Sequence, residues 1–260
     1  MADPSRPDRA APLERLLTVY GRKPVRETLL DTSLQCHALH LAHSNRESGI
    51  VAEIRSLAKE RDIPVREHSR EELSRISKNG RQDQGVALDV LCPRFASLQH
   101  FLDARETGAG VRLLALDGVT NPQNLGMIIR SAAAGNVDGI LLPRHGNAAL
   151  GPLVIKASAG TVFRAPILSC PHLAGALESC RTAGATICTL ESGAEHSLFE
   201  WPEAAFSVYV LGNESDGVSA AARERADQRL AIPMNNGVES LNVAVTASLI
   251  AFLPLARVES

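Results

Sequence analysis

The sequence has few aromatic residues, no long apolar run and no paired cysteines. Aromatic side chains make up 3% of the 260 residues, so the core must be aliphatic, and stacking on aromatic rings cannot be the main way of holding a nucleic-acid base. No run of about 18 apolar residues occurs, which excludes a membrane-spanning helix. The five cysteines are odd in number and form no C-x-x-C pair, which disfavours a disulfide framework and a structural zinc site. We therefore expect a cytoplasmic protein.

The rest of the composition is that of a folded chain. Hydrophobic residues make up 45% and charged residues 22%, enough to bury the cores of one or two domains. The net charge of −2 argues against a protein that coats nucleic acid through bulk electrostatics. Residues 1–12 contain three prolines and no apolar stretch, which indicates a disordered leader rather than a signal or transit peptide.

Helices and strands are expected to alternate along two units separated by a linker. The first unit, residues 13–93, is predicted to be a small α/β domain with two helices within 13–30, strands at 38–42 and 85–91, and a helix at 49–61. Residues 94–110 are predicted to be the linker, with a short amphipathic segment at 98–104.

From residue 111 to residue 260 the alternation is stronger. Strands are predicted at 111–116, 139–142, 162–168, 186–190, 205–211 and 230–232, and helices at 125–134, 173–183 and 241–253. Strands that are apolar throughout and separated by helices belong in a parallel sheet covered on both faces. The fold class is therefore α/β.

Several common sites are missing from this unit. It has no G-x-G-x-x-G between a strand and a helix, no glycine-rich loop that ends in Gly-Lys-Ser/Thr, and no G-x-S-x-G turn. A metal cluster of His37, His40 and His43 is disfavoured because these residues would alternate between the faces of a strand and no acidic partner is near in sequence. We expect them to be surface histidines, and we expect no metal.

Polar clusters follow three of the predicted strands. The first cluster, residues 121–130, places Asn124 at the start of a helix, where it is either a simple cap or a functional group. Arg130 lies further along among apolar neighbours, so we expect it to be buried and to need a partner. The second cluster, residues 211–217, offers Glu214 as that partner. A loop after a strand is the usual place for a ligand crevice in an α/β sheet.

The third cluster, residues 232–245, consists of a strand, a glycine-containing loop and a helix whose first turn is expected to hold Ser240 and Asn242. Ser240 as a plain helix cap is the alternative. Together the three clusters resemble the three motifs of the SpoU/TrmH family of RNA 2′-O-ribose methyltransferases in the SPOUT superfamily, over roughly residues 113–253. Residues 20–88 resemble the small substrate-binding domain often fused to this family, with Asp83 in place of the usual histidine.

The resemblance implies an S-adenosylmethionine-dependent, homodimeric enzyme whose mostly parallel sheet ends in a C-terminal trefoil knot. It implies that the cofactor meets Gly212, Ile232 and Leu241, held largely by backbone groups. Catalysis is assigned to Arg130, either as a base or as a stabiliser of the developing alkoxide. The family roles of the other motif residues are to hold the ribose or phosphate, to orient the arginine and to shape the site, and these fall on Asn124, Glu214, Ser240 and Asn242.

The substrate expected from this two-domain arrangement is ribosomal RNA, with transfer RNA as the close alternative. Residues 13–93 are expected to recognise RNA through the basic residues Arg15, Arg22, Lys23 and Arg26. An RNA-binding protein without catalysis is disfavoured by the complete set of motif residues. An α/β enzyme acting on a small molecule is the third interpretation, and it predicts no affinity for RNA.

Overall fold

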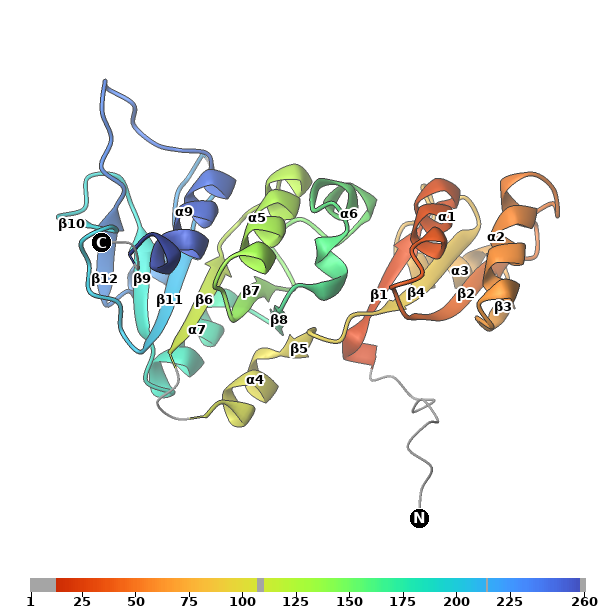
Figure 1. The fold of residues 1–260 in the computed structure, drawn as a ribbon, viewed down its shortest axis with the longest axis horizontal. Coiled ribbons are helices and arrows are strands. Elements are labelled where there is room, and N and C mark those ends of the chain that lie inside the picture. Colours follow the sequence, from red (N-terminus) through yellow and green to blue (C-terminus); the bar gives the residue numbers. More distant parts are fainter. Residues whose placement is uncertain (1–12, 107–109, 214, 258–260) are drawn as a thin grey trace, which may run out of the picture. The chain divides into compact units, whose positions relative to one another are not determined.

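The computed structural model describes residues 13–106, 110–213 and 215–257. The chain divides into two compact units, Met1–Pro93 and Arg94–Ser260 (Figure 1). The predicted leader, residues 1–12, lies outside the described residues. None of the described helices combines the length and the apolar character needed to cross a bilayer. The five cysteines are free thiols.

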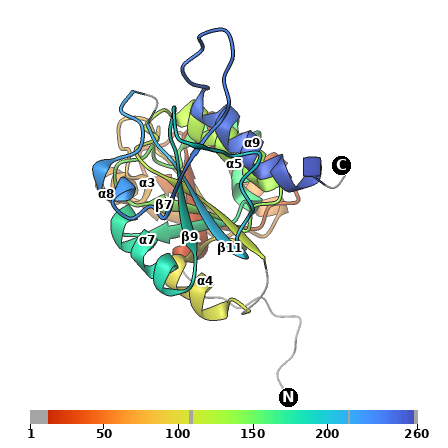
Figure 2. The same ribbon diagram turned by 90° about the vertical axis from the view of Figure 1, so that its left-hand side faces the viewer.

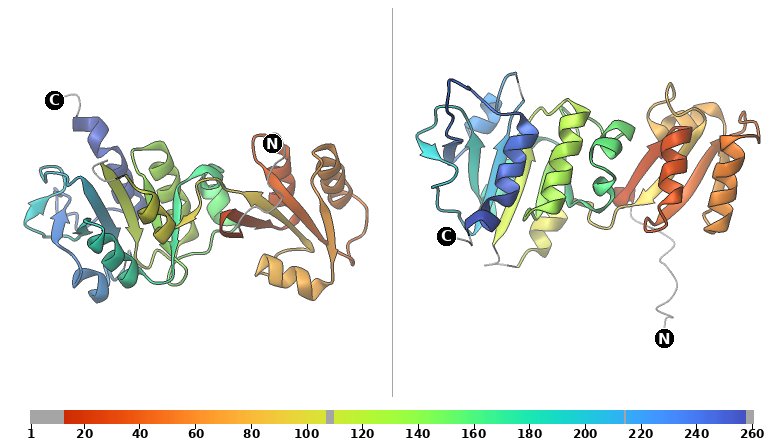
Figure 3. Two further views of the ribbon diagram at one scale, coloured as in Figure 1. Left: turned by 90° about the horizontal axis from the view of Figure 1, so that it is seen from below. Right: turned by 45° about the horizontal axis from the view of Figure 1, so that its top comes forward.

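The first unit is a mixed four-stranded sheet with helices on both faces. Its strand order is β1-β4-β2-β3, with β1 and β2 antiparallel to β4 and β3 parallel to β2. Figure 3 shows α3 on the opposite side of the sheet from α1 and α2. The elements are η1 (Leu13–Arg15), β1 (Leu16–Tyr20), α1 (Arg22–Leu30), β2 (Cys36–Ala42), α2 (Ile50–Glu60), β3 (Val65–His68), α3 (Arg70–Ser77) and β4 (Val86–Leu91).

The prediction of a helix over residues 16–20 is wrong, because these residues form β1. Leu17 and Val19 are buried and alternate with less buried neighbours, which is the period of a strand. Val19 pairs with Leu88 of β4. A short apolar run fits either a helix or a strand on sequence alone, and here the pairing with a distant strand decides.

A hydrogen-bonded chain of polar side chains crosses this sheet. His40 is 3% exposed, and its Nε2 lies 3.0 Å from Asp89 Oδ2 while its Nδ1 lies 2.9 Å from His68 Nε2. The Thr18 hydroxyl donates to Asp89 Oδ1 over 2.7 Å. The prediction that His40 is a surface residue is therefore wrong, since Asp89 reaches it from a strand 49 residues further along the chain. Among the described residues, no group of three or more His, Cys, Asp or Glu is placed to hold a metal ion.

The second unit is built on an eight-stranded sheet in which all the paired neighbours run parallel, in the order β10-β12-β9-β11-β6-β7-β8-β5. The central strands are buried along their whole length, as the apolar runs predict. The strands are β5 (Ala96–Ser97), β6 (Val111–Leu116), β7 (Gly139–Pro143), β8 (Ile167–Cys170), β9 (Thr186–Leu190), β10 (His196–Ser197), β11 (Phe206–Leu211) and β12 (Gln228–Ala231).

Helices cover both faces of this sheet, which confirms the predicted α/β class. Figure 2 shows α5 and α9 along one side and α4, α7 and α8 along the other. The trefoil knot stays a prediction. The helices are α4 (Leu98–Ala104), α5 (Pro122–Ala134), α6 (Pro152–Ala157), η2 (Thr161–Arg164), α7 (Leu173–Thr182), α8 (Ala220–Arg223) and α9 (Val243–Arg257).

Two segments differ from the predicted elements of this unit. The segment indicated as a linker, residues 94–110, contributes β5, which pairs with β8, and α4 to the second unit. The strand expected over 162–168 begins only at Ile167, because residues 161–164 form η2. A single apolar run therefore contains two different elements.

Helices α5 and α9 are in close contact through small residues. The hydroxyl oxygens of Ser131 and Ser248 lie 2.8 Å apart. A Cβ atom on Gly135 would lie 2.6 Å from the carbonyl oxygen of Ala251, so glycine is needed where the two backbones meet. This contact fixes the helix that follows β6 against the helix that follows β12.

Candidate functional site

The three polar clusters lie at one edge of the second sheet. Each follows a strand, β6, β11 or β12, and together with β9 these strands are consecutive in the sheet order β12-β9-β11-β6. Since all four are parallel, their carboxyl ends are at the same edge, and the loops that follow them meet there. The sequence therefore brings together segments that are about a hundred residues apart.

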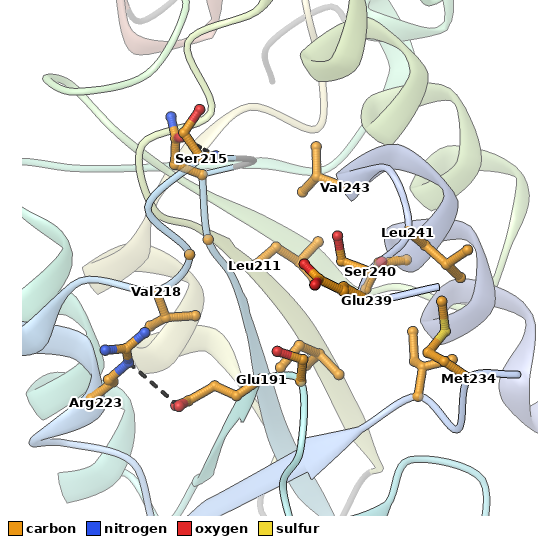
Figure 4. A pocket seen from close by; sticks show the side chains of 17 residues that line it. Glu191, Leu211, Ser215, Val218, Arg223, Met234, Glu239, Ser240, Leu241 and Val243 are labelled. Carbon is orange, nitrogen blue, oxygen red and sulfur yellow. Dashed lines mark hydrogen bonds and ion pairs between the residues drawn. The ribbon is translucent and has the colours of Figure 1, made fainter. Parts of the chain in front are cut away.

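A cavity of about 410 Å³ lies between these loops (Figure 4). Its walls come from the segments after β9, β11 and β12 and from the start of α9. Gly212, Ile232 and Leu241, the residues expected to bind a cofactor, all line it, and so does Ser240. The full lining is Leu190, Glu191, Ser192, Leu211, Gly212, Asn213, Ser215, Gly217, Val218, Arg223, Ile232, Met234, Glu239, Ser240, Leu241, Val243 and Thr246.

The loop after β11 folds tightly back on itself at Gly212. Asn213 and Gly217 exchange backbone hydrogen bonds of 3.0 and 2.9 Å. A Cβ atom on Gly212 would lie 2.2 Å from the Gly217 carbonyl carbon and 2.3 Å from the Val218 nitrogen. Only glycine leaves room for this approach, so Gly212 sets the shape of one cavity wall.

Side chains tie this loop to the loop that follows β6. Asn213 Nδ2 donates to the Gly118 carbonyl over 2.8 Å. The Ser219 backbone N–H donates to Asp117 Oδ2 over 2.7 Å. The loop after β6 and the loop after β11 therefore hold each other in place.

Asn124 and Asn242 join the first cluster to the third. Asn242 Nδ2 donates to Asn124 Oδ1 over 3.2 Å, and Asn124 is 6% exposed. The interpretation of Asn124 as a simple cap is wrong, because α5 begins earlier than predicted and Asn121 caps it by accepting from the Gln123 N–H. Asn124 is therefore a buried amide in the first turn of α5 that pairs with another amide and does not cap the helix.

The start of α9 also differs from the prediction. The helix begins at Val243, so Ser240 and Asn242 precede it instead of lying in its first turn. Asn242 Oδ1 accepts from the Ala244 N–H over 2.8 Å, which is a capping bond. Ser240 is exposed and faces the cavity. Asn242 therefore has two structural bonds, whereas Ser240 belongs to the cavity wall.

Arg130 does not have the environment that its apolar neighbours predicted. Its side chain is exposed, because it lies on the same outward face of α5 as Gln123 and Met127, while Ile128 and Ile129 face inward. Among the described residues it has no hydrogen-bonded or ion-paired partner. The expected partner, Glu214, lies outside the described residues.

Three charged residues that line the cavity, Glu191, Arg223 and Glu239, were missed by the sequence reasoning. Glu191 follows β9, and Arg223 lies in α8; their Oε2 and Nε atoms are 3.4 Å apart. Thr189 Oγ1 donates to Glu191 Oε1 over 2.8 Å. Glu191 carries the same signal as the three clusters, a polar residue directly after an apolar strand, but without a recognisable pattern around it.

The basic residues predicted to bind RNA do not form one cluster. Arg22 and Lys23 follow β1, whereas Arg15 precedes it, at the other end of the strand. Arg26 pairs with Glu53 over 2.7 Å. Arg22 donates to Asn45 Oδ1 over 3.1 Å and to the Gln84 carbonyl over 3.3 Å.

Asp83 has a structural position in the first unit. Its side chain is 4% exposed. It accepts from the Ser77 hydroxyl over 2.8 Å and from the Gly85 N–H over 2.9 Å. A carboxylate at this position therefore anchors the turn that leads into β4.

Comparison with known proteins extends over both units. The model of the "SpoU rRNA Methylase family" matches residues 112–252. The model described as "RNA 2'-O ribose methyltransferase substrate binding" matches residues 18–95. The first match lies within the second compact unit, and the second match lies in the first unit and ends two residues beyond it.

Individual proteins are similar along most of the chain. Proteins named "Uncharacterized tRNA/rRNA methyltransferase" from Mycolicibacterium gilvum and Mycolicibacterium smegmatis are 33% and 34% identical over 233 residues, which is 89% of this chain and 74% of theirs. The AdoMet complex of the SpoU methyltransferase AviRb from Streptomyces viridochromogenes has the same fold, with a TM-score of 0.63 and 21% identity over 95% of this chain and 92% of that one. The AdoMet-bound rRNA methyltransferase from Sinorhizobium meliloti gives a TM-score of 0.64 and 22% identity over 95% and 89%. With its three loop clusters joined at one sheet edge, this chain belongs to the SpoU rRNA methylase family.

Proposed function

We propose that this protein transfers a methyl group from S-adenosylmethionine to a ribose 2′-hydroxyl of ribosomal RNA. The observation that carries the proposal is the cavity enclosed by the loops after β9, β11 and β12, with the Asn124–Asn242 pair beside it. The match of residues 18–95 to an RNA-substrate-binding model supports RNA as the methyl acceptor.

The cavity fits an adenosine-containing cofactor. Its volume of about 410 Å³ lies within the range of about 300–1,000 Å³ for small-molecule pockets. Leu211, Ile232 and Leu241 provide apolar surface, and the backbone turn at Gly212 provides N–H and C=O groups. The cofactor supplies an electrophilic methyl group on a sulfonium sulfur, and it has no phosphate, so the lack of a glycine-rich phosphate loop is expected.

We assign to Asn124 the binding of the acceptor ribose or its phosphate. Its amide plane is fixed by the 3.2 Å bond from Asn242, and Asn242 is itself fixed by its bond to the Ala244 N–H. Holding a nucleophile in one orientation is a large part of catalysis in a displacement reaction. Ser240, on the cavity wall, would border the same space.

We assign to Arg130 the stabilisation of the negative charge that develops on the 2′-oxygen. A guanidinium cation keeps its protons in proteins, so charge stabilisation suits it better than proton removal. Glu214 would orient Arg130 in this arrangement. In a single chain Arg130 is exposed to water, which weakens any electrostatic effect.

Formation of a homodimer would shield Arg130 from water. Met127 is 41%, Val245 47% and Phe252 40% exposed, and they lie on the outward faces of α5 and α9, which pack side by side (Figures 1 and 2). An exposed apolar surface of this kind marks a protein interface. Arg130 lies on the same face of α5 as Met127, so a second copy that covers this surface would also remove water from around Arg130.

In the first unit we propose that RNA contacts one end of the sheet. Arg22 and Lys23 follow β1 in the first turn of α1, while Arg46 follows β2 and Lys78 and Arg81 precede β4 in loops, so all five lie at the same end of the sheet. Bonds from Asn45 and Arg22 to Gly85 and Gln84 hold these loops together. Positive side chains on connected loops suit the phosphates of a folded RNA. Arg15 and Arg26, at other positions, would contribute less.

The test is to map 2′-O-methyl groups in RNA from cells with and without this protein. Our proposal expects one ribose in ribosomal RNA to lose its methyl group, and the purified protein to restore it in vitro with S-adenosylmethionine. Loss at a transfer-RNA ribose instead would favour the transfer-RNA alternative. No change in any RNA, with RNA binding retained, would indicate a protein that binds RNA without catalysis.

A further inference from the structure

Two carboxylates that line the cavity, Glu191 and Glu239, have no role in the function proposed above, and of these Glu239 is exposed to solvent. Glu191 lines the cavity directly after β9, and its side chain is 18% exposed. Figure 4 shows it with Arg223 on one side of the cavity, opposite Ser215 and Val243. A carboxylate that is mostly buried costs free energy unless it is hydrogen-bonded or paired with a cation.

The protein fixes both oxygens of this carboxylate. Thr189 donates to Oε1 over 2.8 Å, and Arg223 Nε lies 3.4 Å from Oε2. An ionised carboxylate accepts up to about four hydrogen bonds and donates none. Each oxygen therefore keeps a lone pair for a donor from the ligand, and the two oxygens are held in a defined plane.

The cofactor has three groups that donate hydrogen bonds: the adenine amine, the ribose diol and the ammonium group. Arg223 beside the carboxylate disfavours a second cation at the same place, which argues against the ammonium group. A single amine would use only one of the two oxygens. The 2′- and 3′-hydroxyls are neutral and adjacent, so they match two acceptors side by side, as a carboxylate binds a ribose hydroxyl in many dinucleotide sites.

We propose that Glu191 accepts hydrogen bonds from the ribose 2′- and 3′-hydroxyls of the cofactor, while Thr189 and Arg223 hold its carboxylate in place. The inference rests on the proposed function, because it takes the cavity as the S-adenosylmethionine site. The diol is at the edge of the sugar remote from the carbon that carries the sulfonium group. Glu191 is therefore a cofactor-binding and specificity-determining residue that does not touch the reacting atoms.

The test measures ligand binding by calorimetry on the full chain and does not depend on turnover. The ligands are S-adenosylhomocysteine, its 2′,3′-dideoxy analogue, and 5′-methylthioadenosine, which keeps the ribose but lacks the amino acid. The proteins are wild type, Glu191→Gln, and Glu195→Gln as a matched control, because Glu195 is exposed and does not line the cavity.

We expect Glu191→Gln to weaken S-adenosylhomocysteine and 5′-methylthioadenosine by about tenfold to a hundredfold, since hydrogen bonds to a charged group contribute about 1.5–3 kcal/mol. Glu195→Gln should leave both affinities unchanged. The dideoxy analogue should bind wild type about as weakly as S-adenosylhomocysteine binds Glu191→Gln, and the variant should not discriminate between these two ligands.

Three results would overturn the inference. Wild type binding the dideoxy analogue as tightly as its parent would do so without any variant, even if Glu191→Gln fails to fold. A loss of S-adenosylhomocysteine affinity with unchanged 5′-methylthioadenosine affinity would place the carboxylate at the amino-acid end. Additive losses from the variant and the analogue would make Glu191 a structural residue. By contrast, no binding of any adenosyl ligand to wild type would refute the cavity as the cofactor site.

Discussion

Adding one methyl group at Gly212 should damage the cavity without touching any of its other side chains. In Gly212→Ala the new Cβ would lie 2.2 Å from the Gly217 carbonyl carbon and 2.3 Å from the Val218 nitrogen, whereas carbon atoms in contact are about 3.5–4.0 Å apart. The obstacle is backbone on the other arm of the same turn. The arm from Asn213 to Gly217 must therefore move by about 1 Å or more.

Overpacking of this kind costs about 1–3 kcal/mol, which corresponds to about a fivefold to 150-fold change in an equilibrium constant. The cost should appear as weaker S-adenosylmethionine binding by calorimetry and as a lower free energy of unfolding in urea. The matched control is Gly175→Ala in α7, where nothing lies within 4 Å of the added Cβ and alanine favours the helix by up to about 1 kcal/mol. Unchanged cofactor affinity and unchanged unfolding in Gly212→Ala would refute the close approach.

Three further predictions concern other parts of the chain. Arg130→Ala should lower turnover by at least about a hundredfold with little change in cofactor affinity. Arg130→Lys should have nearly as low a turnover, because lysine lacks the planar guanidinium fork. Initial rates near those of wild type in Arg130→Lys would show that a positive charge alone is enough. Val245→Glu should turn a dimer into a monomer by light scattering, whereas Leu30→Glu, at an exposed leucine of the first unit, should not; identical masses would contradict the α5–α9 interface. Burial opposes ionisation of Asp89, but hydrogen bonds from His40 and Thr18 and the charge of His40 hold the pKa of Asp89 below its usual value. The ionised carboxylate therefore stabilises the fold above about pH 4, and this stabilisation is lost as the pH falls further. The free energy of unfolding, measured in urea at assay pH values from 6 down to 3, should therefore fall less for Asp89→Asn than for wild type. An equal fall in both proteins would contradict this.

The sheet of the second unit could be predicted from sequence because its strands are buried on both faces. Such strands are apolar throughout, and β9, at 186–190, has the predicted bounds. β1 could not be predicted in this way. Its short apolar run became a strand only through pairing with β4, a contact between residues about 70 positions apart.

The motif residues of the site were predicted, but their environments were not. Gly212, Ile232, Ser240 and Leu241 line one cavity, and their contact with a cofactor or substrate stays a prediction. Arg130 was expected to be buried because apolar residues surround it in sequence, yet one of them, Met127, is also exposed. Apolar neighbours in the sequence do not distinguish a helix that is buried within one chain from a helix face that is covered by a second chain.

The bond between Asn124 and Asn242 also has a consequence for how the protein is made. The two residues are 118 positions apart, and the second is fixed by the start of α9. During synthesis Asn124, in α5, therefore emerges from the ribosome long before its partner Asn242. A chain that stops between the second cluster and α9 has the first two clusters but no assembled site, so incomplete chains that meet RNA at the place of their own synthesis would have no means of modifying it.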